Sequence, residues 1–205
     1  MSIENAKTRA RALIFSSEGY INHMYLDTVS QVTIGYGTML PSSTAATRVQ
    51  MFVRETKAPA EIKEKIAEWD AMRKLSPAGA KLNNLASSYE ASSTLIITEG
   101  EAVRLFQEKL DGFVVMLQSA YPKFDTFPED AQVAMIDMAY NLGTKIHTVF
   151  KSFTKAINDE KGPDWEKAAK ESNRPQLSAA RNSEVRELFL SAAKEAAAKA
   201  KAKLK

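Results

Sequence analysis

The chain has 205 residues, 44% of them hydrophobic, which suits one domain or two lobes that share a core. It contains no cysteine, which excludes a disulfide scaffold and a thiolate metal site, and its two histidines are too few to suggest a metal site. The net charge of +3 lies in the tail: residues 194–205 hold five Lys and one Glu, so the remaining residues sum to −1. A nucleic-acid-binding body is therefore not expected.

The N-terminal apolar run is short. It covers only Ala12–Phe15, far below the ~20 residues of a membrane-spanning helix. It is also too short for the core of a signal peptide. We expect no transmembrane segment, and expect another export route if the protein works outside the cytoplasm.

The first predicted elements are a helix and a hairpin. Apolar residues at helical spacing predict a helix over residues 3–17, and Gly19 would end it with Glu18 in its last turn. From Met24 to Tyr36, β-branched and aromatic residues predict a small antiparallel hairpin that turns near residues 28–31. That turn has no Asn-Gly or Asp-Gly pair, so its geometry is not predicted.

The rest of the chain is predicted to be mainly helical. Residues 83–94 are polar and predict a loop or an irregular segment. Thr98–Glu101 fits a capping box, and Pro128 is placed to open a helix. Helices are predicted over residues 60–75, 98–113, 128–143, 150–157, 164–171 and from 183 into the tail. The expected fold class is therefore α+β and mostly α.

Two carboxylates and a hydroxyl lie close together at the start of the chain. Glu18, Asp27 and Thr33 fall across the predicted helix end and hairpin. A pair of carboxylates in one cleft is the working part of most glycoside hydrolases. Their spacing alone is weak evidence, because a solvated Glu, an ordinary hairpin Asp and an ordinary strand Thr would give the same pattern.

Three blocks carry a resemblance to a known family: residues 18–37, ending in Thr33-Ile34-Gly35-Tyr36-Gly37, residues 97–106, and residues 134–169, which include Asn141-Leu142-Gly143. In this order the chain resembles the phage-type lysozymes, the muramidases of bacteriophage endolysins and related secreted effectors, over about residues 3–190. The resemblance implies a lysozyme-like catalytic domain over 1–190, with a small hairpin lobe (18–40), a helical insertion (42–95), a larger helical lobe and an active-site cleft between the lobes. Residues 191–205 would be an Ala/Lys-rich tail.

The resemblance also implies a chemistry. Glu18 would be the general acid, Asp27 would stabilise positive charge on the sugar and orient a water, and Thr33 would hold that water. The reaction would invert the anomeric carbon, with the carboxyl groups roughly 6.5–9.5 Å apart. The substrate would be peptidoglycan, cut at the β-1,4 bond between N-acetylmuramic acid and N-acetylglucosamine, with no cofactor and no metal.

Three further residues are candidates for substrate binding. Tyr36 and Asn141 would line the sugar cleft by stacking and hydrogen bonding. Arg181 lies where the family often has a basic residue near the acid, so it would either pair with Glu18 or face solvent on its helix.

The chain departs from the family pattern in three places. Thr38 stands where a His usually follows the Gly-x-Gly turn. The link from Thr38 to Thr98 is longer than in the short phage enzymes and is expected to contain an extra helix with Trp69. The lysine-rich tail has no counterpart, and it is either a frayed terminus or a segment attracted to anionic cell-envelope polymers.

Other functions stay open at this stage. A non-catalytic peptidoglycan-binding module would not need the trio, a lytic transglycosylase needs the acid but no water-orienting pair, and a chitin-specific enzyme is not excluded. We expect a monomer that causes bacterial lysis at the cell wall, in the periplasm of a host or target cell, with no nucleic-acid partner. Its role would be phage release or attack on a competitor, the latter implying an immunity protein.

Overall fold

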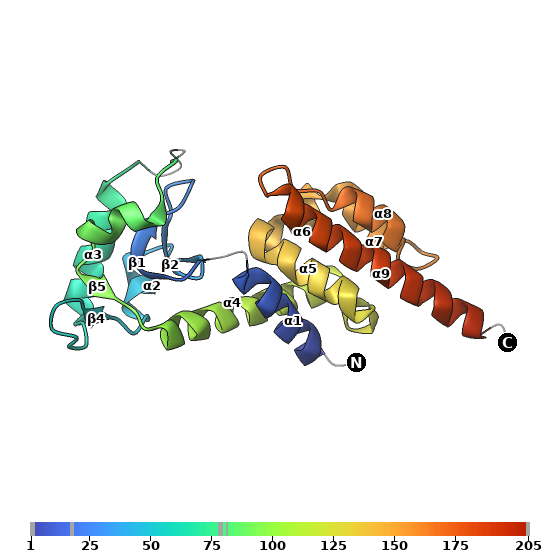
Figure 1. Cartoon of the computed structure of the whole chain (residues 1–205), viewed down its shortest axis with the longest axis horizontal. Coiled ribbons are helices and arrows are strands. Elements are labelled where there is room, and N and C mark those ends of the chain that lie inside the picture. Colours follow the sequence, from blue (N-terminus) through green and yellow to red (C-terminus); the bar gives the residue numbers. More distant parts are fainter. Residues whose placement is uncertain (1–2, 17–18, 78–79, 81, 204–205) are drawn as a thin grey trace. The chain divides into compact units, whose positions relative to one another are not determined.

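The computed structural model describes residues 3–16, 19–77, 80 and 82–203. The chain divides into a hairpin unit, residues 18–109, and a helical unit, residues 1–17 and 110–205. Helices dominate, and the hairpin unit contains a small antiparallel sheet (Figure 1). The predicted fold class, α+β and mostly α, is confirmed.

The hairpin unit holds the strands and the insertion. Its elements are β1 (Ile21–Leu26), β2 (Val32–Gly35), β3 (Thr38–Met39), α2 (Ser43–Thr47), β4 (Phe52–Val53), α3 (Ile62–Lys74), the 3-10 helix η1 (Ala86–Ser92) and β5 (Leu95–Ile96), followed by the first half of α4 (Glu99–Ala120). β1, β2 and β3 form one antiparallel sheet, and β4 pairs with β5 in another. The predicted hairpin and the helix of the insertion are present, whereas β3, β4, β5 and α2 were not predicted.

The β1–β2 hairpin has one apolar face and one polar face. The register pairs Tyr25 with Thr33 and Leu26 with Val32. Because side chains alternate along a strand, residues 24, 26, 32 and 34 share one face, and all four are buried apolar residues. The opposite face carries residues 25, 27, 31 and 33, which include both polar candidates of this hairpin.

The insertion is joined to the sheet by polar contacts. α3 begins with a capping box between Glu61 and Glu64. Trp69 on this helix donates from Nε1 to the carbonyl oxygen of Leu40, 2.9 Å away, just after β3. The Glu68 carboxylate is buried and accepts hydrogen bonds from the backbone N–H groups of Thr94 and Leu95, each at 2.8 Å. These bonds fix α3 against the segment that leads into β5.

The helical unit is built around α5. Its elements are α1 (Ile3–Phe15), the second half of α4, η2 (Phe124–Thr126), α5 (Glu129–Leu142), η3 (Gly143–Lys145), α6 (Ile146–Val149), α7 (Lys151–Ile157), α8 (Trp165–Glu171) and α9 (Ala179–Lys203). Residues 131–140 of α5 are all buried, and α1 and α9 both pack against this helix (Figure 1). Gly143 caps the C-terminal end of α5, and its φ of 65° and ψ of −154° suit glycine.

The structure corrects one predicted helix start and one predicted capping box. α9 begins at Ala179 instead of residue 183, and it continues through the Ala/Lys-rich tail to Lys203. Only half of the predicted capping box forms at α4: Thr98 Oγ1 accepts from the Glu101 N–H at 3.1 Å. The Glu101 carboxylate instead accepts from the Gln50 N–H and from Arg104, which takes it away from the helix start.

Candidate functional site

Asp27 closes the turn between β1 and β2. Its Oδ1 accepts hydrogen bonds from the backbone N–H groups of Val29, at 2.9 Å, and Gln31, at 2.8 Å. Its own N–H donates to the Gln31 carbonyl, and its carbonyl accepts from Ser30. Oδ2 has no hydrogen-bond partner among the described residues. The turn therefore fixes the carboxylate through one oxygen and leaves the other available, at a half-buried position.

Thr33 lies on the same hairpin face as Asp27. Asp27 stands opposite Gln31, and Thr33 is two residues along β2, so the two side chains are diagonal neighbours. The Thr33 hydroxyl donates to the Gln31 carbonyl oxygen at 3.1 Å, and the residue is only 3% exposed. With its proton used in this way, the hydroxyl can act towards a further group only as an acceptor.

Glu18, the third predicted catalytic residue, lies outside the described residues. The structure therefore brings two members of the predicted trio together on one face of the hairpin.

Tyr36 follows β2 and is buried, at 6% exposure. Its hydroxyl donates to Glu99 Oε1 at 2.9 Å, and its ring packs against Tyr20 and Phe106. Burial, reinforced by the hydrogen bond to Glu99, raises the pKa of Tyr36. A ring enclosed in this way has no free face for a sugar, so the structure does not place Tyr36 as a stacking platform.

The Gly-Tyr-Gly motif has a packing role. Gly35 has φ +67°, and a Cβ at this position would lie 3.2 Å from the Cβ of Ala102 on α4. Only glycine combines this conformation with such a close approach. The motif therefore seats the end of the hairpin on the first turns of α4.

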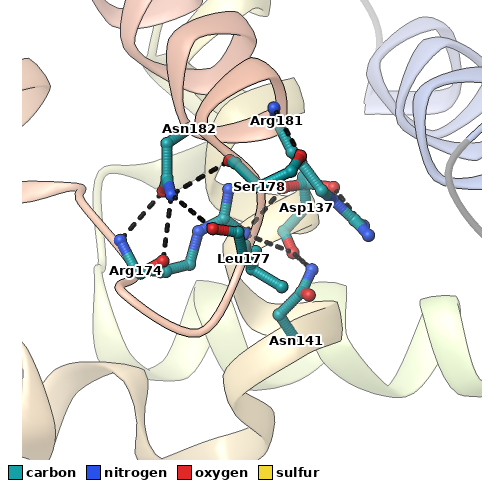
Figure 2. Close-up of polar contacts among 7 residues, drawn as sticks. All are labelled: Asp137, Asn141, Arg174, Leu177, Ser178, Arg181 and Asn182. Carbon is teal, nitrogen blue, oxygen red and sulfur yellow. Dashed lines mark hydrogen bonds and ion pairs between the residues drawn. The ribbon is translucent and has the colours of Figure 1, made fainter.

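A buried charge cluster lies in the helical unit (Figure 2). Asp137, on α5, is fully buried and binds two guanidinium groups. Arg174 Nη1 lies 2.8 Å from Oδ2, and Arg181 Nη2 lies 2.8 Å from Oδ1. Arg174 is fully buried and Arg181 is 7% exposed. The cluster ties α5 to the loop before α9 and to the first turn of α9.

The cluster decides one alternative for Arg181. Its burial shows that the solvent-facing alternative is wrong, and among the described residues it forms an ion pair with Asp137. The other alternative, pairing with Glu18, involves a residue outside the described part of the chain. Asp137 and Arg174 were not predicted as site residues. The sequence contained a signal for Asp137: it is a lone carboxylate within a mainly apolar helical segment, and a buried carboxylate needs a charged or hydrogen-bonding partner. Arg174 lies in a loop, and no local pattern points to it.

Burial is the main influence on Arg174. It lowers the pKa of Arg174, while the charge and hydrogen bond of Asp137 act in the opposite direction. Among the described residues, Nε and Nη2 of Arg174 have no hydrogen-bond partner. Within the described part of the chain, the Arg174 guanidinium therefore has Asp137 as its one partner, and loss of that carboxylate would leave a fully buried guanidinium without compensation.

Asn141 stands one helical turn after Asp137. Its Nδ2 donates to the Asp137 carbonyl oxygen at 2.9 Å, and the side chain is half-buried. The structure thus gathers Asn141 and Arg181 around Asp137 on the helical unit, and Asp27 and Thr33 on the hairpin unit. In the described part of the chain, no group of three or more His, Asp or Glu side chains forms a candidate metal site.

No protein-family model matches the chain, and no curated protein sequence matches it. Within the described residues, no helix combines the length and the apolar character that crossing a bilayer requires.

Proposed function

We propose that this protein is a peptidoglycan hydrolase, a muramidase that cleaves the β-1,4 bond between N-acetylmuramic acid and N-acetylglucosamine. The observation that carries the proposal is the state of Asp27. Its carboxylate is held by two backbone N–H groups on Oδ1, while Oδ2 has no partner among the described residues. A carboxylate that has one oxygen fixed and the other available can act on a bound group without a prior change of its own orientation.

The hairpin face supports a specific role for Asp27 and Thr33. Oδ2 of Asp27 and the lone pairs of the Thr33 hydroxyl are both acceptors, and they lie on one face. Two acceptors would take both hydrogens of a water, which leaves a lone pair of its oxygen for attack on the anomeric carbon. Direct attack by water gives inversion of configuration, and as the new C–O bond forms one proton of the water passes to the Asp27 carboxylate.

The general acid of the proposal is Glu18. It would protonate the leaving oxygen, which requires a pKa raised by burial. Room for a water between the two carboxyl groups of an inverting enzyme corresponds to a separation of roughly 6.5–9.5 Å. Asn141 remains a sugar-binding candidate through its side-chain carbonyl oxygen. Tyr36 has a packing role instead, because its side chain is buried beside the end of the hairpin.

The biological setting is part of the proposal. The protein would act as a monomer on the cell wall, in the periplasm of a host or target bacterium, and would cause lysis. Delivery by a dedicated export route, an immunity protein, and contact of the Lys-rich end of α9 with anionic envelope polymers are further proposals of the same kind.

The test is mass spectrometry of fragments released from purified peptidoglycan in water enriched in oxygen-18. We expect reducing-end fragments that carry one heavy oxygen, formed first as the α-anomer. Glu18→Gln and Asp27→Asn should each lower the rate by about 10²–10⁴-fold. Asp27→Asn is a sharp variant because asparagine keeps Oδ1 for the Val29 and Gln31 N–H groups but replaces Oδ2 by a donor. Thr33→Val removes the second acceptor.

Asp70→Asn is the matched control, because Asp70 is exposed on α3 and has no partner among the described residues. It should leave the rate unchanged. Full activity in Asp27→Asn, with an unchanged circular dichroism spectrum, would remove Asp27 from the mechanism. Products with 1,6-anhydro ends would indicate a lytic transglycosylase, and wall binding without release would indicate a binding module.

A further inference from the structure

A polar cavity lies between α8 and α9 of the helical unit. Its volume is about 470 Å³. Lys170 and Asn173 line it from the end of α8 and the following loop, and Asn182, Ser183 and Arg186 line it from α9. The described lining includes two cationic side chains and no carboxylate.

The two cations are available for a ligand. Lys170 and Arg186 are exposed, and neither has an ion pair or hydrogen bond to another described residue. Glu166 lies one helical turn before Lys170 on α8, but no ion pair joins the two among the described contacts. Glu171 and Glu187 are adjacent in sequence to the two cations, and successive residues of a helix do not face each other. The cavity therefore has a positive lining that internal ion pairs do not neutralise.

The wall of the cavity is built in advance. Asn182 accepts from the Arg174 N–H through Oδ1 and donates through Nδ2 to the Arg174 carbonyl oxygen, both at 2.9 Å (Figure 2). Its amide is thus used to fix the loop that precedes α9. Asn173, by contrast, has no side-chain hydrogen bond to another described residue, so its amide can donate to a ligand.

The start of α9 adds to the positive potential. Ala179, the first residue of this 25-residue helix, also lines the cavity. The Arg181 N–H in this turn already donates to the Ser178 hydroxyl, at 3.2 Å, whereas the N–H groups of the first two helical residues have no acceptor within the helix. The helix dipole also places partial positive charge at this end. Two side-chain cations, an uncommitted amide and a helix start thus converge on one cavity.

We propose that this cavity binds a phosphate group carried by a small polyol or sugar. The cations would bind the phosphate oxygens through charge-assisted hydrogen bonds. The remaining volume and the Asn173 and Ser183 side chains suit the hydroxyl groups of the attached unit, because a cavity of about 470 Å³ is larger than phosphate alone requires. Such a group occurs both in free phosphorylated sugars and in phosphodiester-linked polymers, and the experiment distinguishes the two sources.

The experiment is a titration of the ¹⁵N-labelled full chain followed by NMR. The probes are inorganic phosphate, glycerol 1-phosphate, glycerol, and a poly(glycerol phosphate) chain. We expect saturable shifts of the Asn173 and Ala179 amides with both phosphate monomers, tighter binding of glycerol 1-phosphate than of phosphate, and no saturation with glycerol. Tighter binding of the polymer at equal phosphate concentration would identify a polymer as the source, and equal or weaker binding would identify the free phosphorylated sugar or polyol.

Variants make the test specific. Lys170→Gln and Arg186→Gln should each weaken glycerol 1-phosphate binding by about tenfold. Asn173→Asp, which adds a carboxylate to the lining, should abolish it. Lys123→Gln is the control, because Lys123 is an exposed cation that does not line the cavity, and it should bind like the wild type.

Several results would overturn the proposal: no saturable shifts, equal binding of glycerol, or unchanged affinity in Lys170→Gln and Arg186→Gln with spectra of a folded protein. Because binding is measured without any hydrolysis, this outcome is independent of the muramidase test.

Discussion

The buried charge cluster gives the sharpest prediction on stability. In Asp137→Asn the side chain keeps its shape but loses its charge, and one of its two oxygens becomes an NH₂ group that faces a guanidinium donor. Asp137 and Arg174 are both fully buried, and each Arg–Asp contact is 2.8 Å. Removing one partner of a buried ion pair costs about 3–5 kcal/mol. We expect a loss of this size in the free energy of unfolding of the helical unit.

The assay is urea unfolding followed by tryptophan fluorescence. In a Trp69→Phe background only Trp165 remains, and it reports on the helical unit because it is buried against Phe127 and Phe189. With an m-value of about 1–3 kcal/mol/M, the expected loss moves the midpoint down by about 1 M or more. Asp125→Asn is the control, since Asp125 is exposed, and it should change stability by less than about 0.5 kcal/mol.

A second variant separates charge from packing. Arg174→Met removes one guanidinium but keeps a side chain of comparable length, and it leaves the Asp137–Arg181 pair in place. We expect it to cost less than Asp137→Asn. A loss below about 1 kcal/mol in Asp137→Asn with an unchanged m-value would refute the reasoning, because it would mean that the buried guanidiniums do not depend on this carboxylate.

Two further predictions concern the hairpin unit. Arg73 donates to the carbonyl oxygens of Ser30, at 3.1 Å, and Ser76, at 2.8 Å. Arg73→Met should therefore loosen the β1–β2 turn and speed amide hydrogen exchange at Val29 and Gln31 by about tenfold or more. Arg48→Met, at an exposed position, is the control, and equal exchange rates in the two variants would contradict the role of Arg73. For Glu101, burial raises the pKa, but hydrogen bonds from Arg104 and the Gln50 N–H and the nearby positive charges outweigh it, so the pKa is lowered from 4.5. The Glu101 carboxylate therefore stabilises the folded state above about pH 4.5, and this contribution is lost as the pH falls through the lowered pKa. The difference in unfolding free energy between the wild type and Glu101→Gln should shrink between pH 6 and pH 3. A difference that does not change with pH would contradict this.

The elements that were predicted well are those whose signal is local. Residues 131–140 are buried on every side, and their apolar run with Pro128 before it and Gly143 after it was sufficient to place α5. β1 and β2 followed from β-branched and aromatic residues over a short span. The two-residue strands β3, β4 and β5 carry too few residues for any periodic pattern. β3 forms by pairing with the nearby β2, and β4 and β5 form by pairing with each other across more than forty residues.

The β1–β2 turn shows why local patterns were insufficient there. Ser30 adopts φ +58° without being glycine, and the turn contains no glycine at all. Its support comes from the insertion: the Ser30 hydroxyl donates to the Ala80 carbonyl oxygen, its own carbonyl accepts from Arg73, and Leu82 donates to the Thr28 carbonyl. These partners are separated from the turn by more than forty residues. The insertion therefore holds the turn that carries Asp27.

Asp27 and Asp137 show what the structure adds to a sequence-based assignment of function. The sequence analysis named Asp27 as a catalytic candidate and did not name Asp137. In the structure, both oxygens of Asp137 are bound by guanidinium groups and the side chain is fully buried, so it holds three chain segments together and has no oxygen left for a ligand. Asp27 has one oxygen fixed by the backbone and one without a described partner, at a half-buried position. A carboxylate that acts on a substrate needs both a fixed orientation and an available oxygen, and of these two only Asp27 meets both conditions.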